Sequence, residues 1–255
     1  MALKILRAEA FRNKPSAVLF DTDNTLYDAD AAHEEATEAA ELKACKLLGT
    51  TRQVFRDVFT QARASVKKQL GKTASSHSRL LYFQSAIEIL GMKTQLLMTL
   101  DIEQTYWRAF LHASVLYPDV REFILDLRSA GIRTAVITDL TSRIQFRKLI
   151  YFGLDEYFDY VVTSEEAGAD KPARAPFEIA LRKLDVASQE CWMIGDSEDA
   201  DIAGARAFGI TILHKQHGNA KPCPIADGAF VDFGDLCELL VQKRWLERNF
   251  DPLHA

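Results

Sequence analysis

Ala17-Val-Leu-Phe-Asp-Thr-Asp-Asn-Thr25 is the stretch that decides the fold, because four apolar residues lead directly into two carboxylates and a hydroxyl. A short apolar run bounded by polar turn residues is typical of an interior strand. Asp21 and Asp23 would then lie at the carboxyl edge of a sheet, where open α/β folds bind their ligands. Two carboxylates this close repel each other unless a cation lies between them or one is protonated. The alternative is that both only cap the turn and helix that follow, where Asp and Thr are favoured.

The composition indicates a globular protein that binds neither nucleic acid nor membrane. The chain has 255 residues, is 48% hydrophobic and carries a formal net charge of -5, whereas a nucleic-acid surface draws on clustered positive charge. Arg143, Arg147 and Lys148 do cluster, and we interpret them as a solvated helix face. We find no secretory signal and no apolar run long enough to span a bilayer. The four cysteines lie far apart and lack zinc spacing, so we expect a cytoplasmic protein with reduced thiols.

The order of the predicted elements indicates an α/β fold with an inserted helical segment. Helical patterns follow one another at residues 30–48, 52–70, 75–90 and 94–113. From residue 117 onward, helices near 120–129, 143–151, 176–184 and 200–208 alternate with strands at 134–137, 160–163, 191–194 and 211–213. This alternation predicts a Rossmann-like parallel sheet with helices on both faces. We therefore expect a discontinuous α/β core, residues 1–27 and 117–255, interrupted after its first strand by a helical bundle, residues 28–116.

Three further strand ends carry side chains suited to phosphate and metal chemistry. Thr138 and Asp139 follow the strand at 134–137, where a hydroxyl and nearby backbone N–H groups can hold an anionic oxygen. Lys171 lies in the loop after the next strand and can neutralise charge on a transferring group, although an isolated lysine is more often a surface residue. Asp196 follows the strand at 191–194, and hard oxygen ligands with few imidazoles favour Mg²⁺ over zinc or copper.

Taken together, these motifs resemble those of the haloacid dehalogenase superfamily. The match is ordered along the chain: Asp21-x-Asp23-x-Thr25, then Thr138, then Lys171-Pro172, then Gly195-Asp196 with Asp201. It covers residues 17–27 and 117–233, and the helical insertion corresponds to the cap that the superfamily places between its first two motifs. Four motifs in this order are far more specific than any one of them. The stretch at 153–166 is similar to the nucleotidase and small-metabolite phosphatase branch.

The resemblance implies a Mg²⁺-dependent phosphatase that works through an aspartyl-phosphate. Asp21 would attack phosphorus, and Asp23 would protonate the leaving alcohol and later activate water. The side chains of Asp21 and Asp196 and the backbone carbonyl of Asp23 would bind Mg²⁺. The residues expected at the phosphoryl oxygens are Thr138, Asp139 and Lys171, and those expected to support the site from behind are Asp201 and Thr25.

Two positions after Thr138 depart from the superfamily pattern. Asp139 stands where relatives often carry Asn, and Leu140 stands where they carry Gly. A carboxylate that points into a phosphate pocket is unfavourable, so we expect the side chain of Asp139 to face away. The segment after Lys171-Pro172 also lacks the acid that often follows in relatives.

We expect the substrate to be a small phosphorylated metabolite, such as a nucleotide or a sugar phosphate, and the protein to be a monomer or a homodimer. A phosphomutase is an alternative, because it keeps both acids of the first motif. A dehalogenase is disfavoured, because it does not need Asp23 to protonate an alcohol. A non-catalytic phosphate-binding module is disfavoured because Asp21, Asp23, Lys171 and Asp196 are all present.

The helical insertion begins directly after the motif that contains Asp23, so we expect it to cover the site and to select the substrate. Most of its polar and aromatic side chains should pack or be solvated. The candidates for substrate contact are His77, Arg79, Tyr82, Tyr106, Trp107 and Arg108. Outside the insertion, we interpret His214 and His217 as ordinary loop residues rather than a second metal site.

Overall fold

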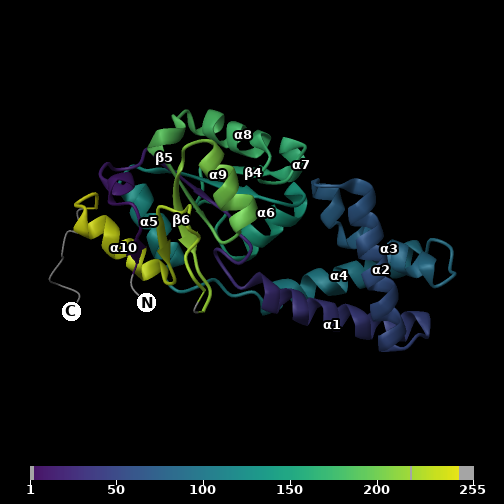
Figure 1. Ribbon diagram of the computed structural model, residues 1–255. Coiled ribbons are helices and arrows are strands. Elements are labelled where there is room, and N and C mark those ends of the chain that lie inside the picture. The colour runs from purple at the N-terminus through teal and green to yellow at the C-terminus, as the bar shows by residue number, and fades with distance from the viewer. Residues whose placement is uncertain (1–2, 219, 247–255) are drawn as a thin grey trace, which may run out of the picture.

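The computed structural model describes residues 3–218 and 220–246, which are built around one seven-stranded sheet (Figure 1). The strand order is β1-β7-β6-β5-β2-β3-β4, and neighbouring strands are parallel except for β1 and β7. The strands are β1 Lys4–Ile5, β2 Ala17–Phe20, β3 Arg133–Thr138, β4 Tyr160–Thr163, β5 Cys191–Gly195, β6 Thr211–Lys215 and β7 Gly228–Phe230. The predicted α/β class is confirmed.

Two apolar clusters hold helices against the two faces of the sheet. Alternate residues of β2 divide between them, because successive strand side chains point to opposite faces: Val18 and Phe20 belong to one cluster, Ala17 and Leu19 to the other. The first face is covered by α5 (Val120–Ser129) and α10 (Phe233–Gln242), the second by α8 (Arg174–Leu184) and α9 (Ala203–Ala207). Figure 1 shows these two pairs on opposite sides of the strands. All four residues of β2 are therefore buried.

The helical insertion between β2 and β3 is joined to the core where its chain leaves and returns. Asn24 Oδ1 accepts a hydrogen bond from Ala29 N at 2.9 Å, directly behind Asp23, and the backbone N of Tyr117 donates to Leu26 O at 2.9 Å on the way back. Figure 1 shows α1 and α4 side by side beyond the sheet; α1 packs on α4, and α2 packs on α3. The elements are α1 Ala29–Leu48, α2 Arg52–Leu70, η2 Ala74–His77, α3 Arg79–Ile89 and α4 Leu96–Ala113.

Most predicted elements coincide with observed ones, and the differences have local causes. The helix predicted at 75–90 is divided at Ser78, whose backbone is extended and whose side chain caps α3 by accepting from Leu81 N at 3.3 Å. The helix predicted at 200–208 begins earlier, as a π-helical turn, η4 Glu198–Ile202. The edge strands β1 and β7 and helix α10 were not predicted. The remaining helices are η1 Ala8–Phe11, α6 Ser142–Tyr151, α7 Ser164–Ala167 and η3 Ser188–Glu190.

The described part of the chain contains no helix that combines the length and the apolar character needed to cross a membrane.

Candidate active site

The carboxyl edge of the central strands gathers side chains from separate parts of the chain. Asp21 follows β2, Thr138 ends β3 and Asp196 follows β5. Because β2 lies between β3 and β5 and all three are parallel, these ends meet at one edge. Lys171, from the loop after α7, reaches the same place: its Nζ lies 2.5 Å from Oδ1 of Asp21. The structure thus brings together residues that the sequence had placed in four separate motifs.

Asp21 is buried and is bound on both carboxylate oxygens. Lys171 contacts Oδ1, and Thr25 Oγ1 donates to Oδ2 at 2.9 Å. Burial raises the pKa of Asp21 to about 7; the charge of Lys171 opposes this rise and the charge of Asp201 adds to it. The carboxylate is therefore held in one orientation, in surroundings that disfavour its negative charge.

Lys171 bridges two acids at the base of the site. Its Nζ lies 2.7 Å from Oδ1 of Asp201, and it also donates to the carbonyl oxygen of Ile137 at 2.9 Å. The other carboxylate oxygen of Asp201 accepts from the backbone N of Ser197 at 3.0 Å. Burial acts to lower the pKa of Lys171, but the charges of Asp201 and Asp21 outweigh it and hold the pKa well above its ordinary value. Lys171 is therefore charged at neutral pH.

Gly195 leaves the space in which Asp201 reaches Lys171. A Cβ atom at residue 195 would lie 2.5 Å from Cβ and Cγ of Asp201, which is far closer than carbon atoms approach in proteins. Any side chain here would displace the Asp201 carboxylate. This contact gives a physical reason for the glycine in the Gly195-Asp196 motif.

Asp23 forms an ion pair that the sequence did not reveal. Nζ of Lys148 lies 2.9 Å from both carboxylate oxygens of Asp23, and the hydroxyl of Tyr27 donates to Oδ1. The interpretation of Lys148 as part of a solvated helix face was wrong: its side chain is 2% exposed, and its ammonium lies over the rings of Phe110 and Trp107. Burial acts to raise the pKa of Asp23, but the charge of Lys148 and the hydrogen bonds from Tyr27 and Lys148 lower it to about 2.

The acids at this edge fit a hard divalent cation. One carboxylate oxygen from each of Asp21, Asp196 and Asp201 lies within 4.8 Å of the other two. Burial raises the pKa of Asp196 to about 7, and the charge of Asp21 adds to this rise. Lys171 supplies one positive charge against three carboxylates, so a further cation is favourable. A donor set made of oxygen atoms suits Mg²⁺.

Mg²⁺ is expected to stabilise the protein more at about pH 7 than at about pH 5. Without metal, the pKa values of Asp21 and Asp196 are about 7 against an ordinary 3.8, so the folded state keeps protons that the unfolded state loses. These two groups therefore lower the stability as pH rises through that interval. Mg²⁺ favours the charged carboxylates and should remove this loss. Thermal unfolding at both pH values, in EDTA and in excess Mg²⁺, measures the effect; an equal Mg²⁺ increment at both pH values would contradict it.

The residues after β3 form the wall beside Lys171. Thr138 Oγ1 lies 2.7 Å from Thr22 Oγ1. The carboxylate of Asp139 accepts from the backbone N of Lys171 at 3.0 Å and from Ser164 Oγ at 2.8 Å, so its charge is used to hold the loop that carries Lys171. Leu140 has φ of 139°, a conformation that favours glycine. A leucine in this conformation costs on the order of 1–3 kcal/mol of local backbone strain.

A cavity of about 390 Å³, hereafter the active-site cavity, joins this edge to the helical insertion. Asp21, Lys171 and Asp196 lie on its core side. The residues that line it from the insertion are His33, Arg63, Lys67, His77 and Arg79. His33, Arg63 and Lys67 were missed in the sequence, where the only signal was the i, i+4 spacing that places Arg63 and Lys67 on one helix face.

The candidates for substrate contact within the insertion lie in different environments. His77 and Arg79 line the active-site cavity. Tyr82, Tyr106 and Trp107 are almost fully buried in helix packing, and Arg108 lines a different cavity beside Arg143 and Arg147.

His214 lies in strand β6 and not in a loop, which corrects the sequence interpretation. Its Nε2 lies 3.1 Å from the carbonyl oxygen of Asp196, and its Nδ1 accepts from the backbone N of Cys223 at 3.1 Å. These two bonds assign the proton to Nε2 and leave Nδ1 as the acceptor. His214 therefore fixes the backbone beside the acidic cluster. The ring of His217 lies 6.0 Å from that of Tyr117.

Comparison with known proteins agrees with this geometry. A family model described as haloacid dehalogenase-like hydrolase matches residues 15–209. A ribulose-1,5-bisphosphate 5-phosphatase from Halopiger xanaduensis is 39% identical over 217 residues, which cover 84% of this chain and 90% of that protein. A glyceraldehyde 3-phosphate phosphatase from Methanopyrus kandleri is 30% identical over 202 residues, covering 79% of this chain and 84% of that one.

The fold is also found in solved structures. A HAD phosphatase from Thermococcus onnurineus matches with a TM-score of 0.67 at 23% identity, covering 88% of this chain and 97% of that chain. The putative HAD-hydrolase YfnB from Bacillus subtilis matches with the same TM-score, 0.67, at 21% identity, covering 90% of this chain and 100% of that one. These solved structures share the fold, and the family model and the curated relatives show that the chain belongs to the haloacid dehalogenase-like hydrolase family and is a phosphatase within it.

Proposed function

We propose that this phosphatase hydrolyses a small phosphorylated metabolite with the help of Mg²⁺, through a phosphoryl group carried on Asp21. The observation that carries the proposal is the position of the Asp21 carboxylate, which lies in the active-site cavity between Lys171 and Asp196. Phosphoryl transfer depends mainly on positioning and on neutralising charge. This set of residues supplies a fixed oxygen nucleophile and a buried cation beside it.

Two steps account for the hydrolysis. In the first, a carboxylate oxygen of Asp21 bonds to phosphorus, the bond from phosphorus to the alcohol oxygen breaks, and that oxygen takes a proton from Asp23. In the second, water attacks the phosphorus of the aspartyl-phosphate and gives a proton to Asp23, which frees phosphate and the Asp21 carboxylate. Thr138 and Lys171 hold the phosphoryl oxygens in both steps, while Asp139 keeps the loop of Lys171 in place.

Asp23 must carry a proton in the first step, although Lys148 favours its charged form. The negative charge of a bound phosphoryl group raises the pKa of a neighbouring carboxylate and so opposes Lys148. In the second step the charged form is the one required, because it removes a proton from water. We therefore assign Lys148 and Tyr27 the task of holding Asp23 in position and of favouring its basic form.

The side chains of Asp21 and Asp196 and the backbone carbonyl of Asp23 would hold Mg²⁺. When bound, the ion supplies positive charge that neutralises the phosphoryl oxygens. Thr25 would orient Asp21 by its hydrogen bond to Oδ2, and Asp201 would orient Lys171.

Residues 28–116 would act as a cap domain over the core formed by residues 1–27 and 117–255. Two contacts between the insertion and the core support this arrangement. The backbone N of Asp170 donates to Lys72 O at 3.2 Å, and His77 Nε2 lies 3.0 Å from the Asp170 carboxylate. Asp170 directly precedes Lys171, so these contacts connect the insertion to the catalytic loop.

For the substrate we propose a sugar phosphate. The two curated relatives described above are named for a sugar bisphosphate and a triose phosphate, and an active-site cavity of about 390 Å³ suits a small metabolite. We expect the active protein to be a monomer or a homodimer.

Release of phosphate from an aryl phosphate tests the proposed function. We expect turnover in Mg²⁺, loss of at least about 100-fold after EDTA treatment because the acids then lack their cation, and recovery when Mg²⁺ is restored. Equal rates with and without EDTA would contradict the role of the metal. No release from the aryl phosphate or from a panel of sugar phosphates would contradict hydrolysis itself.

A further inference from the structure

Three basic side chains of the insertion gather on one wall of the active-site cavity. Arg63 and Lys67 lie one turn apart on α2, and Arg79 is the first residue of α3. Because α2 packs against α3, these side chains face the same space, and all three line the active-site cavity together with Asp21 and Lys171. We call Arg63, Lys67 and Arg79 the cap cation cluster.

In residues 3–218 and 220–246, the members of the cap cation cluster form no ion pair with a carboxylate, and the charge of Asp170 acts on Lys67 only from beyond ion-pair distance. Burial lowers the pKa of Lys67, and repulsion from Arg63 and Arg79 lowers it further. Arg63 is exposed and Lys67 and Arg79 are half-buried, and gathering three like charges on one wall is unfavourable unless an anion is bound there.

Arg79 is held in place by groups that leave its charge unneutralised. Its Nε donates to Tyr106 OH at 3.0 Å, and its other nitrogens donate to the carbonyl oxygen of His77 at 2.8 Å and to the His33 ring at 3.2 Å. Burial and the charge of Arg79 lower the pKa of His33 to about 3, so His33 is neutral at physiological pH. The guanidinium also lies 5.4 Å from the centre of the Tyr106 ring. Neutral acceptors and an aromatic ring thus fix the cation before any ligand arrives.

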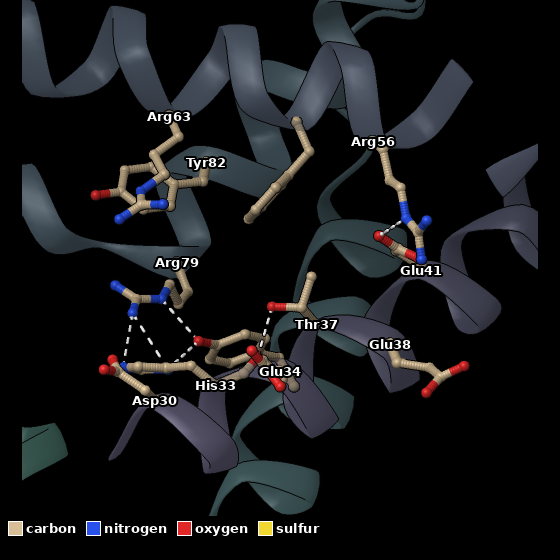
Figure 2. A pocket seen from close by; sticks show the side chains of 12 residues that line it. Asp30, His33, Glu34, Thr37, Glu38, Glu41, Arg56, Arg63, Arg79 and Tyr82 are labelled. Carbon is tan, nitrogen blue, oxygen red and sulfur yellow. Dashed lines mark hydrogen bonds and ion pairs between the residues drawn. The ribbon is translucent and has the colours of Figure 1, made fainter. Parts of the chain in front are cut away.

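Nearer the start of α2, Arg56 is paired with an acid, unlike Arg63. A second cavity, of about 670 Å³, continues from the active-site cavity and shares His33, Arg63 and Arg79 with it. Figure 2 shows the guanidinium groups of Arg63 and Arg79 at one end of this cavity and Arg56, paired with Glu41, at the other. Positive charge is therefore held in an ion pair at the Arg56 end. At the other end, where Asp30 also lies, Arg63 and Arg79 form no ion pair with a described residue (Figure 2).

Acidic side chains on α1 limit where an anion can lie. Asp30, Glu34 and Glu38 line the second cavity and would repel it. The favourable position is the wall shared by the two cavities, near Arg63 and Arg79. An anionic group bound there would belong to the same small molecule whose phosphoryl group lies on Asp21.

We propose that the cap cation cluster binds a second anionic group of the substrate, so that the substrate class is a sugar phosphate with another phosphate or a carboxylate at a distance from the scissile phosphoryl group. This inference rests on the proposed function. One end of the molecule would be held by Lys171 and Thr138, and the other by Arg63, Lys67 and Arg79. A substrate with a neutral far end would leave the cluster without its counter-charge.

The test compares substrate pairs that differ only in the second group. Ribulose 1,5-bisphosphate is compared with ribulose 5-phosphate, and phosphoglycolate with 2-hydroxyethyl phosphate. The measured quantity is the ratio of kcat/KM within each pair, for the wild type and for the double variant Arg63→Gln/Lys67→Gln. Arg79 is left unchanged because it is part of the aromatic packing. The control is Lys46→Gln/Lys68→Gln, which removes the same number of positive charges from exposed residues of the insertion that form no ion pair with a carboxylate of the described chain and line neither cavity.

We expect the wild type to favour the doubly anionic member of a pair by at least about 10-fold, and the Arg63→Gln/Lys67→Gln variant to lose most of that ratio, chiefly through KM, since a charge-assisted contact is worth about a factor of ten. The control should keep the ratio. A loss confined to the bisphosphate pair identifies phosphate, and one confined to the phosphoglycolate pair identifies carboxylate. The inference is overturned if the wild type shows no preference in either pair, or if the control loses as much as the cluster variant. Failure of the proposed function is distinguishable, because the wild type would then release no phosphate from any of the four compounds.

Discussion

Asp21→Asn is expected to lower kcat on an aryl phosphate by at least about 10,000-fold, because it removes the attacking oxygen anion and the acyl-phosphate can no longer form. The fold should survive. Asn has nearly the same volume; its oxygen can still accept from Lys171 while its NH2 donates to Thr25 Oγ1, and Lys171 keeps its contact with Asp201 at 2.7 Å. Initial-rate kinetics and thermal unfolding of the same preparation measure both effects.

Asp199→Asn is the matched control for this substitution. Asp199 is an exposed acid in the turn after β5, so its change removes one negative charge near the site without touching the nucleophile. The control should retain wild-type kcat within about twofold, because exposed charges act weakly. Appreciable turnover by a folded Asp21→Asn protein would remove Asp21 from the mechanism.

Lys171→Met is expected to have the second largest effect, and it should act on stability as well as on rate. The side chains of Lys171 and Asp201 are 2% and 1% exposed, so the substitution leaves buried carboxylates without their cation. Breaking such a pair typically costs about 3–5 kcal/mol of unfolding free energy. We also expect kcat to fall by about 1,000-fold, because charge on the transferring phosphoryl group is then poorly neutralised. Urea denaturation and initial rates measure the two losses.

Added Mg²⁺ separates the two roles of Lys171. The ion should restore part of the stability of Lys171→Met, since it can neutralise Asp21, but it should not restore kcat. Lys183→Met provides the control, because Lys183 pairs with Glu166 at 2.7 Å on the surface, where such pairs contribute less than about 1 kcal/mol. Equal destabilisation by the two substitutions, or an active Lys171→Met protein, would contradict the assignment.

The fold and the core side of the site could be predicted because their signals are local. Residues 17–20 are all apolar and all buried, and the polar residues directly behind them have to lie at the sheet edge. The same reasoning places Thr138 and Asp196 at the ends of β3 and β5. Parallel pairing then brings these ends together without any knowledge of the loops.

The short elements at the far edge of the sheet gave weaker signals. β1 has two residues and β7 has three, which is too short for a hydrophobic alternation to be recognised. Their pairing depends on tertiary contact, since β1 lies antiparallel to β7 from the opposite end of the chain.

Residues on the insertion side of the site could not be predicted, because their roles arise from packing between helices. Lys148 has the basic neighbour Arg147 and belongs to a helix with exposed positions, so the sequence favours a solvated side chain. Only the docking of α6 beside α4 places its ammonium against Phe110 and Trp107 and within reach of Asp23. The cap cation cluster could not be predicted for the same reason, since it depends on how α2 packs against α3.

The aspartyl-phosphate itself offers the most direct test of the account. Wild-type protein mixed with Mg²⁺ and an excess of a reactive aryl phosphate, quenched in acid during turnover and digested with protease, should yield a peptide that contains residue 21 and has gained the mass of one phosphoryl group. Fragmentation should place that group on Asp21, and hydroxylamine should remove it, as expected for an acyl phosphate. Turnover with no such peptide, or a phosphoryl group found on another residue, would contradict the claim that Asp21 is the nucleophile.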